Sequence, residues 1–238
     1  MMRRMKAAQT LIVPVAVVAG LLALVIVRRV EPTLGSFTTS VRWRSAAQLH
    51  HNARAASALD GVVIQPGEVF SFNETVGACT SERGYVRAPA IIEGRLEDSP
   101  GGGVCQVSST LYNAALLSGL EMIERQAHSY PVASVPPGRD ATVVFGGTDL
   151  RFRNSLPGPI TIRAAAGRSQ LVVRIAGRRS ARSEFRLAAE VDESAGPDAR
   201  GTRYLTANVW REQLRDGRLI GREFISSDVY QTEARVGP

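Results

Sequence analysis

The middle of this chain is organised by the stretch Gly101-Gly102-Gly103-Val104-Cys105-Gln106-Val107-Ser108-Ser109-Thr110-Leu111-Tyr112-Asn113-Ala114-Ala115, in which a glycine triplet leads into an amphipathic segment. When these residues are placed on a helix at about 100° per residue, the apolar ones gather on one side: Val104, Val107, Leu111, Ala114 and Ala115. Cys105, Ser109 and Tyr112 gather on the opposite side, and Ser108 lies at its edge. The pattern predicts a helix over residues 104–117, with Cys105 in the first turn on the polar face.

The predicted position of Cys105 favours chemistry at its sulfur. The first turn of a helix stabilises negative charge through its unpaired amides and the helix dipole, which favours a thiolate. The glycines Gly101, Gly102 and Gly103 let the backbone approach a ligand closely and present N–H groups to an oxyanion. Free cysteine is most often buried as a small hydrophobic residue, so a cysteine on a polar face indicates a nucleophile.

A cysteine nucleophile needs a base, and the chain has only three histidines. His128 follows Cys105 along the chain, just before a region of predicted strands, and is the favoured base. The pair His50-His51 belongs to an earlier predicted helix and is a weaker choice. Asp140 is the favoured residue to orient the His128 imidazole, and Asp149 is the second choice. Cysteine, histidine and acid follow one another as in papain-like thiol enzymes, which is an analogy of order alone.

Each of these residues also has a structural interpretation. Cys79 and Cys105 can pair in a disulfide if the domain is exported to an oxidising compartment. A single histidine is more often a structural residue than a base, and an aspartate such as Asp140 is as often a turn or cap residue. The glycine triplet can equally be a flexible loop. From the residues alone, a thiol enzyme and a structural disulfide therefore both stay open.

The composition excludes several classes of protein. The chain has 238 residues, of which 44% are hydrophobic and 21% charged, which is typical of a globular protein and not of a disordered one. Two cysteines and three histidines exclude a disulfide-rich scaffold and a four-cysteine zinc site, and we expect no metal and no cofactor. The net charge of +7 is not arranged as a basic stripe with interleaved aromatic residues, so we expect no nucleic-acid partner.

The N-terminus predicts a membrane anchor. Residues 7–27 contain only Gln9 and Thr10 as polar side chains, and a helix of that length is about 30 Å long, like a bilayer core. Arg28-Arg29 ends the run without a small-residue cleavage site. We therefore expect a single-pass anchor in the cell membrane with the following domain on the extracytoplasmic side, and a cleaved signal peptide is the alternative.

The remaining pattern predicts an α+β fold, with helices first and an antiparallel sheet after them. A helix is expected over residues 45–59, because apolar or small residues recur at helical spacing and Asp60-Gly61 follows as a stop signal. Loops are expected over residues 31–40 and 73–103. Period-two alternation predicts strands at residues 62–64, 69–72, 132–135, 141–145, 150–152, 160–162 and 171–175.

The last sixty residues are expected to form an extension of the central domain. A charged connection or poorly packed hairpin over residues 177–201 precedes a hairpin whose strands flank the turn signal Asp216-Gly217. The sequence thus divides into an anchor and linker (1–35), a central domain (36–176) and a C-terminal β-hairpin extension (177–238).

Several segments of the central domain resemble the VanW family. The stretch 101–115 carries the strongest likeness, and shorter segments support it: Pro66–Asn73, Arg83-Gly84-Tyr85, His128-Ser129, Gly138–Val143 and Asp149–Asn154. Some VanW domains have been linked to L,D-transpeptidation, in which a cysteine joins the stem peptides of peptidoglycan. The resemblance implies an exported or membrane-anchored protein in which Cys105 is the nucleophile and His128 its base.

The resemblance therefore implies a membrane-anchored cell-wall enzyme of the L,D-transpeptidase type, with Asp140 orienting the base and peptidoglycan stem peptides as partners. We expect the stem peptide to be bound by the glycine triplet and the polar helix face: Gly101, Gly102, Gly103, Gln106, Ser108, Ser109 and Tyr112. Cys79 is a departure from the family pattern. A non-catalytic peptidoglycan-binding or scaffold module linked to glycopeptide resistance is the alternative, and a cysteine peptidase acting on stem peptides is the third possibility.

Overall fold

The computed structural model describes residues 32–92, 95–179, 183–194, 196–199 and 201–232, which belong to a compact unit spanning Pro32–Pro238. The predicted anchor, residues 7–27, lies outside the described residues. Within the described ranges, no helix has the length and apolar character that a membrane span requires.

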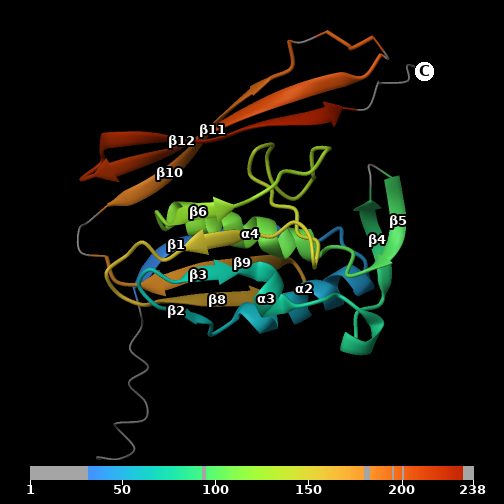
Figure 1. The fold of residues 1–238 in the computed structure, drawn as a ribbon, viewed down its shortest axis with the longest axis horizontal. Helices are drawn as coiled ribbons and strands as arrows, with labels where there is room; N and C mark the ends of the chain where they lie inside the picture. Colours follow the sequence, from blue (N-terminus) through green and yellow to red (C-terminus); the bar gives the residue numbers. More distant parts are fainter. Residues whose placement is uncertain (1–31, 93–94, 180–182, 195, 200, 233–238) are drawn as a thin grey trace, which may run out of the picture. The chain divides into compact units, whose positions relative to one another are not determined.

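A four-stranded sheet and two helices form the centre of the unit (Figure 1). The sheet has the order β1-β9-β8-β2, and its strands are Thr33–Ser40, Gln170–Gly177, Ile160–Ala166 and Val63–Ile64. All of these neighbours pair antiparallel. The helices α2 (Ala46–Leu59) and α4 (Val104–Leu117) pack against this sheet, and their buried faces join its inward residues in one core.

Local sequence signals explain both helices. The Ser45 side chain accepts a hydrogen bond from the Gln48 amide, and the Gln48 side chain accepts one from the Ser45 amide, which is a capping box that starts α2. Helix α4 starts after Gly103, whose φ of 100° lies in the left-handed region that favours glycine. The helix predicted over residues 104–117 is confirmed, and so is the helix predicted over residues 45–59, with Ser45 as its cap.

A second sheet adds to the same core. Its order is β3-β7-β6, with strands Val69–Ser71, Arg151–Arg153 and Glu121–Glu124. The rings of Phe70 and Phe152 stack across it with centroids 4.8 Å apart. Between β3 and α4 the chain forms short elements: α3 (Phe72–Val76), the 3-10 turn η1 (Ser81–Arg83), and the hairpin of β4 (Arg87–Ile92) with β5 (Arg95–Pro100).

The C-terminal residues form a third sheet, which has the order β10-β11-β12 (Figure 1). Its strands are Glu184–Asp192, Arg203–Arg215 and Arg218–Thr232, and Asp216-Gly217 forms the turn of the predicted hairpin. One face of β11 is buried, and Arg211 on this face donates to the carbonyl of Leu120 at 2.6 Å. The sheet is therefore packed against the residues that follow α4.

The structure corrects four of the sequence assignments. Residues 33–40 form β1 instead of a linker, and residues 73–103 hold α3, η1, β4 and β5 instead of loop alone. The strands predicted at 132–135 and 141–145 are absent from these described residues, where only an isolated bridge between Gln126 and Thr142 occurs. Within the charged connection, Glu184–Asp192 is a regular strand that pairs with β11 over its whole length.

Candidate active site

Cys105 occupies the second position of α4 and is partly exposed. Both cysteines are free thiols, so the disulfide alternative is absent from this structure. The Cys105 sulfur lies 3.6 Å from the carbonyl oxygen of Val143, which belongs to the segment that follows Asp140. The thiol is thus held at the boundary between the N-terminus of α4 and a neighbouring loop.

The glycine triplet has a fixed conformation because its neighbours enclose it. A Cβ atom at Gly102 would lie 2.5 Å from the carbonyl oxygen of Ala88 and 2.6 Å from that of Pro89. The Gly102 carbonyl is also 2.9 Å from Nδ1 of His51, a fully buried side chain. His51 Nε2 accepts from the Val86 amide, so Nδ1 must carry the proton and donate to Gly102. His51 therefore supports the loop and is not a base for Cys105.

Two backbone amides at the start of α4 remain available to a ligand. The amides of Gly102, Val104 and Gln106 donate to carbonyl groups within the loop. Among the described residues, the amides of Gly103 and Cys105 have no such acceptor, and both residues are partly exposed. They lie at the positive end of a 14-residue helix, which is a favourable place for negative charge on an oxygen atom.

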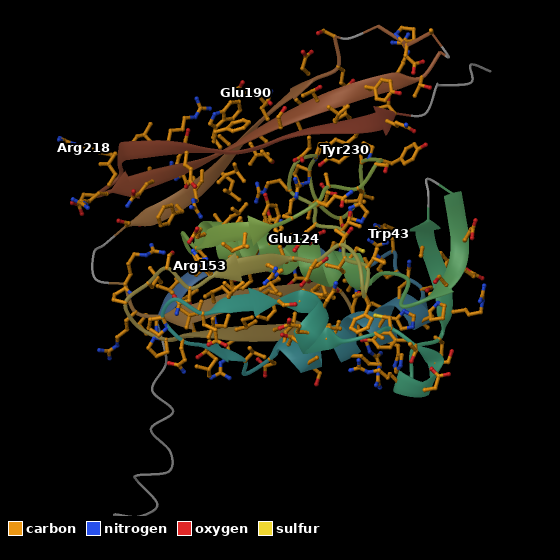
Figure 2. All side chains as sticks on the ribbon, in the orientation of Figure 1. Trp43, Glu124, Arg153, Glu190, Arg218 and Tyr230 are labelled. Carbon is orange, nitrogen blue, oxygen red and sulfur yellow. The ribbon has the colours of Figure 1, made fainter. Side chains whose placement is uncertain are left out.

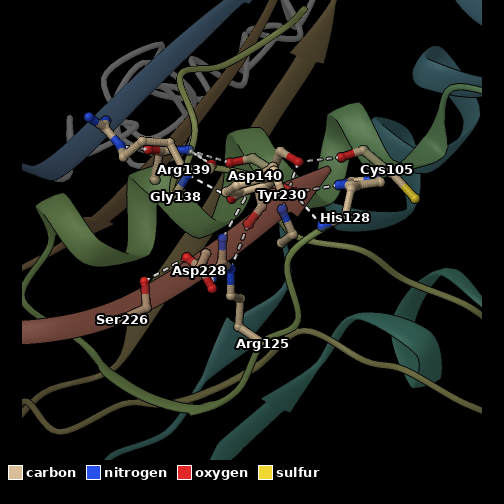
Figure 3. A network of polar contacts seen from close by, with 12 residues as sticks. Cys105, Arg125, His128, Gly138, Arg139, Asp140, Ser226, Asp228 and Tyr230 are labelled. Atoms are coloured by element: carbon tan, nitrogen blue, oxygen red, sulfur yellow. Dashed lines mark hydrogen bonds and ion pairs between the residues drawn. The ribbon is translucent and has the colours of Figure 1, made fainter. Parts of the chain in front are cut away.

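His128 and Asp140 form a pair next to the thiol (Figure 3). His128 Nδ1 is 2.5 Å from Asp140 Oδ2, and the same oxygen accepts from the His128 amide at 2.7 Å. Asp140 is 1% exposed and His128 13% exposed, so this pair is shielded from water. The nearby Cys105 thiol contributes, together with Asp140, to raising the pKa of the imidazole. The structure therefore brings together the three residues that the sequence analysis chose as catalytic.

The surroundings keep both members of the pair charged. Burial lowers the pKa of His128, but hydrogen bonds with Asp140 and Cys105 outweigh this effect and raise the pKa to about 9. Burial raises the pKa of Asp140, but bonds from His128, Tyr230 and Arg125 outweigh it and hold that pKa below its usual value. An imidazolium and a carboxylate therefore face each other at neutral pH.

The other oxygen of Asp140 is held by residues that the sequence analysis missed. The Tyr230 hydroxyl donates to Asp140 Oδ1 at 2.5 Å, and Arg125 Nη2 donates to it at 3.2 Å. Arg125 also binds the carboxylate of Asp228 at 2.6 Å. Tyr230 and Asp228 lie on β12, and alternation along this strand places them on one face with Ser226 (Figure 3). Only this alternation could have singled them out in the sequence.

Four of the residues expected to bind the stem peptide are buried: Gln106, Ser108, Ser109 and Tyr112. Gln106 donates to the Ser40 carbonyl at the end of β1, and the Tyr112 ring lies under the Arg125 guanidinium at 5.0 Å. Ser108 and Ser109 bind the backbone of Ala141.

Ser108 and Ser109 fasten the segment next to Asp140 to the first turns of α4. The Ser108 hydroxyl donates to the Ala141 carbonyl at 2.6 Å. The Ser109 hydroxyl donates to the Cys105 carbonyl at 2.6 Å and accepts from the Ala141 amide at 2.9 Å. These side chains therefore set the spacing between Cys105 and the His128–Asp140 pair.

Two further residues considered in the sequence analysis lie apart from the pair. Asp149, the second choice for orienting the base, instead accepts from the Ser71 hydroxyl at 2.5 Å and from the Asn73 amide at 2.9 Å. Cys79 packs on the glycine loop, because a Cβ atom at Gly101 would lie 2.5 Å from its Cβ. Burial raises the pKa of the Cys79 thiol. No group of metal-ligating side chains occurs in the part of the chain that the structure describes.

Comparison with known proteins identifies the family of this chain. The model of one family, described as VanW like protein, matches residues 48–176, and the chain therefore belongs to the VanW family, as its sequence predicted. A relative from Bacillus subtilis (strain 168), named "Uncharacterized protein YoaR", is 47% identical over 131 residues, which are 55% of this chain and 43% of that protein.

A second relative is the "Vancomycin B-type resistance protein VanW" of Enterococcus faecalis (strain ATCC 700802 / V583). It is 35% identical over 105 residues, which are 42% of this chain and 38% of that protein. The chain thus spans less than half the length of both relatives. No solved structure matches it significantly.

Proposed function

We propose that this protein is a cell-wall enzyme in which Cys105 carries out acyl transfer of the L,D-transpeptidase type on peptidoglycan stem peptides. The observation that carries the proposal is the position of His128, whose Nδ1 lies 2.5 Å from the Asp140 carboxylate and whose pKa is raised by both Asp140 and Cys105. A buried acid that contacts a histidine, with a cysteine on the other side of the imidazole, is the arrangement that activates a thiol for nucleophilic attack.

In the first half of the reaction, the Cys105 thiolate attacks the carbonyl of an L,D peptide bond in a donor stem. The carbonyl oxygen becomes an oxyanion, which the amides of Gly103 and Cys105 stabilise. The imidazolium of His128 then donates its proton to the leaving amine, the C–N bond breaks, and the terminal D-residue departs. The stem remains as a thioester on Cys105.

In the second half, an amine of an acceptor stem attacks the thioester. Neutral His128 takes the proton that this amine loses, the C–S bond breaks, and the thiolate–imidazolium pair is restored. Asp140 stabilises the imidazolium in the resting state and keeps Nδ1 protonated throughout. If water enters instead of the amine, the same residues hydrolyse the stem.

The wall of the substrate site is assigned to the loop that follows Asp140. Val144 and Phe145 are 56% and 58% exposed, and they directly follow Val143, whose carbonyl contacts the Cys105 sulfur. The Asn73 side chain holds this loop through the carbonyls of Val144 and Thr148, both at 3.0 Å. Exposed apolar side chains beside a reactive group provide a surface for a substrate.

The choice of substrate rests on family membership and on the predicted location. The relative from Enterococcus faecalis is named for vancomycin resistance, and vancomycin acts on the cell wall. A single-pass anchor at residues 7–27 would place the domain beside its substrate on the extracytoplasmic side of the membrane. We therefore propose the cell membrane as the location of this protein.

The test uses purified protein and stem tetrapeptides, with the products separated and identified by mass spectrometry. Wild type and Cys79→Ala are expected to release the terminal D-residue and to form cross-linked dimers, whereas Cys105→Ala forms none. Release without dimers identifies a peptidase. Equal products from wild type and Cys105→Ala, or binding of stems without any release, would contradict a catalytic role and favour a binding module.

A further inference from the structure

The C-terminal sheet contacts the proposed catalytic site directly through the hydroxyl group of Tyr230. Tyr230 on β12 (labelled in Figure 2) is fully buried, and its hydroxyl is bonded to both Gly138 and Asp140. The Gly138 amide donates to this oxygen at 2.7 Å, and the hydroxyl in turn donates to Asp140 Oδ1 at 2.5 Å. Because the amide occupies an acceptor position on the hydroxyl, the proton of the hydroxyl is directed to Asp140.

We propose that Tyr230 is a positioning residue for the cysteine site, which makes the C-terminal sheet part of the catalytic unit. The inference rests on the proposed role of Cys105 as a nucleophile. Oδ2 of Asp140 accepts both bonds from His128, so the rotation of the carboxylate decides where Oδ2 points. Tyr230 fixes Oδ1 and thereby fixes this rotation.

Tyr230 shares Oδ1 of Asp140 with a positively charged side chain, so the hydroxyl contributes the orientation of the carboxylate and not a compensating charge. Arg125 also binds Oδ1, at 3.2 Å, and the Arg125 Nε donates to the Asp140 carbonyl at 2.6 Å. The same guanidinium is held by Asp228, to which the Ser226 hydroxyl donates at 2.8 Å. Strand β12 thus reaches Asp140 by two routes, directly through Tyr230 and indirectly through Asp228 and Arg125.

Both routes start from residues outside the region that the family model matches. The family model ends at residue 176, whereas Asp228 and Tyr230 lie more than fifty residues beyond it. If the nucleophile, base and acid of residues 48–176 were sufficient, the sheet would need no buried hydroxyl at this carboxylate. A buried hydroxyl that is bonded on both sides holds its carboxylate partner in one orientation. Because this hydroxyl belongs to the C-terminal sheet, the acid of the site is oriented by a residue outside the region that the family model matches.

The test measures how fast iodoacetamide alkylates Cys105 in the full-length chain. Mass spectrometry of the tryptic peptide 96–125 reads Cys105 alone, because Cys79 falls in another peptide. Four proteins form a double-mutant cycle: wild type, Tyr230→Phe, Asp140→Asn and the combined variant. Tyr204→Phe is the matched control, since Tyr204 lies on the same sheet and its hydroxyl donates to Asp198 at 3.1 Å, away from the site.

We expect Tyr230→Phe to slow alkylation at pH 7 by about tenfold, the order of magnitude for loss of a hydrogen bond to a charged group. In the Asp140→Asn protein the same substitution should change the rate by less than about twofold, because Tyr230 acts through Asp140. Tyr204→Phe should match wild type. A thermal melt of each protein confirms that the measured species is folded.

Two results would overturn the inference. The first is a wild-type rate in folded Tyr230→Phe, and the second is an equal effect of Tyr230→Phe with and without Asp140. If Tyr230→Phe does not fold, Asp228→Asn tests the second route by the same cycle. Alkylation needs no stem peptide, so a protein that shows the expected coupling but forms no stem products contradicts the proposed reaction and leaves this inference standing.

Discussion

Replacing Asp140 by asparagine should change the charge of His128 at neutral pH. In the wild type, burial lowers the His128 pKa, and bonds to Asp140 and Cys105 raise it to about 9. The rise above the ordinary 6.5 corresponds to about 3 kcal/mol in favour of the imidazolium. Asp140→Asn removes the negative charge 2.5 Å from Nδ1 but leaves the burial, so the pKa should fall by about two units.

The assay is a titration of the imidazole C–H signals by NMR, which is simple because the chain has only three histidines. His128→Ala identifies the signal of interest. Wild-type His128 should stay protonated until the pH approaches 9, and in Asp140→Asn it should already be neutral at pH 8. The loss of the Asp140 charge also removes the partner that orients the imidazole beside Cys105, so alkylation of Cys105 at pH 7 to 8 should slow as well.

Asp149→Asn is the matched control for this experiment. Asp149 is also a buried carboxylate, 7% exposed, but its partners are Ser71 and Asn73. Its removal should leave the His128 titration unchanged. The reasoning would be refuted by a wild-type His128 that titrates below pH 7, or by an Asp140→Asn protein in which His128 still titrates near 9.

Three further predictions concern the supports of the site. Gly102→Ala should lower the free energy of unfolding by about 2 kcal/mol or more and slow Cys105 alkylation, because the new Cβ atom would lie 2.5 Å from the Ala88 carbonyl oxygen. The control Gly158→Ala should leave the free energy of unfolding unchanged, because no atom lies within 4 Å of a Cβ atom at that position. His51→Ala should cost about 3 kcal/mol in urea unfolding at pH 7, since a buried donor and acceptor lose their partner, whereas His50→Ala, at an exposed histidine, should cost far less. Burial lowers the pKa of His51, so protonation favours the unfolded state, and the wild type should lose stability as the pH falls below 6.5 while His51→Ala should not show this component. Ser109→Ala should leave the Ala141 amide without an acceptor, cost about 1–3 kcal/mol in the same assay, and disturb the His128 titration.

Local signals predicted the parts of the fold that local interactions determine. Both long helices follow from amphipathic spacing and from caps within a few residues of their ends, and the C-terminal hairpin follows from the turn signal at Asp216-Gly217. The pairing of His128 with Asp140 was predictable as well, because a nucleophilic cysteine would need a base and an orienting acid, and few candidates exist in the chain.

Contacts between distant segments of the chain explain why some strands were predicted wrongly from the sequence. The strand β1 was missed because its sequence is polar and contains Gly35, but a Cβ there would lie 2.6 Å from the backbone of Leu117, so glycine permits close packing on α4. The strand predicted at 141–145 is absent because Ser108 and Ser109 satisfy the backbone of Ala141 in place of a neighbouring strand.

Packing of distant residues on α4 also explains why the face of this helix that carries Ser109 and Tyr112 was wrongly predicted to be exposed. A helical wheel places Ser109 and Tyr112 on a polar side, but it does not show that the 139–142 segment and Arg125 cover this side. Tyr230 was missed for a similar reason, since its partner Asp140 lies ninety residues earlier in the chain and no local pattern connects them.

The role of Cys105 is tested most directly by the covalent intermediate itself. The full-length protein is mixed with a stem tetrapeptide, quenched in acid and digested, and the mass of peptide 96–125 is measured. A nucleophilic Cys105 predicts that this peptide gains the mass of the donor stem without its terminal D-residue, in wild type and Cys79→Ala but not in Cys105→Ala. An unmodified peptide at every quench time, with stem products forming equally in Cys105→Ala, would contradict it.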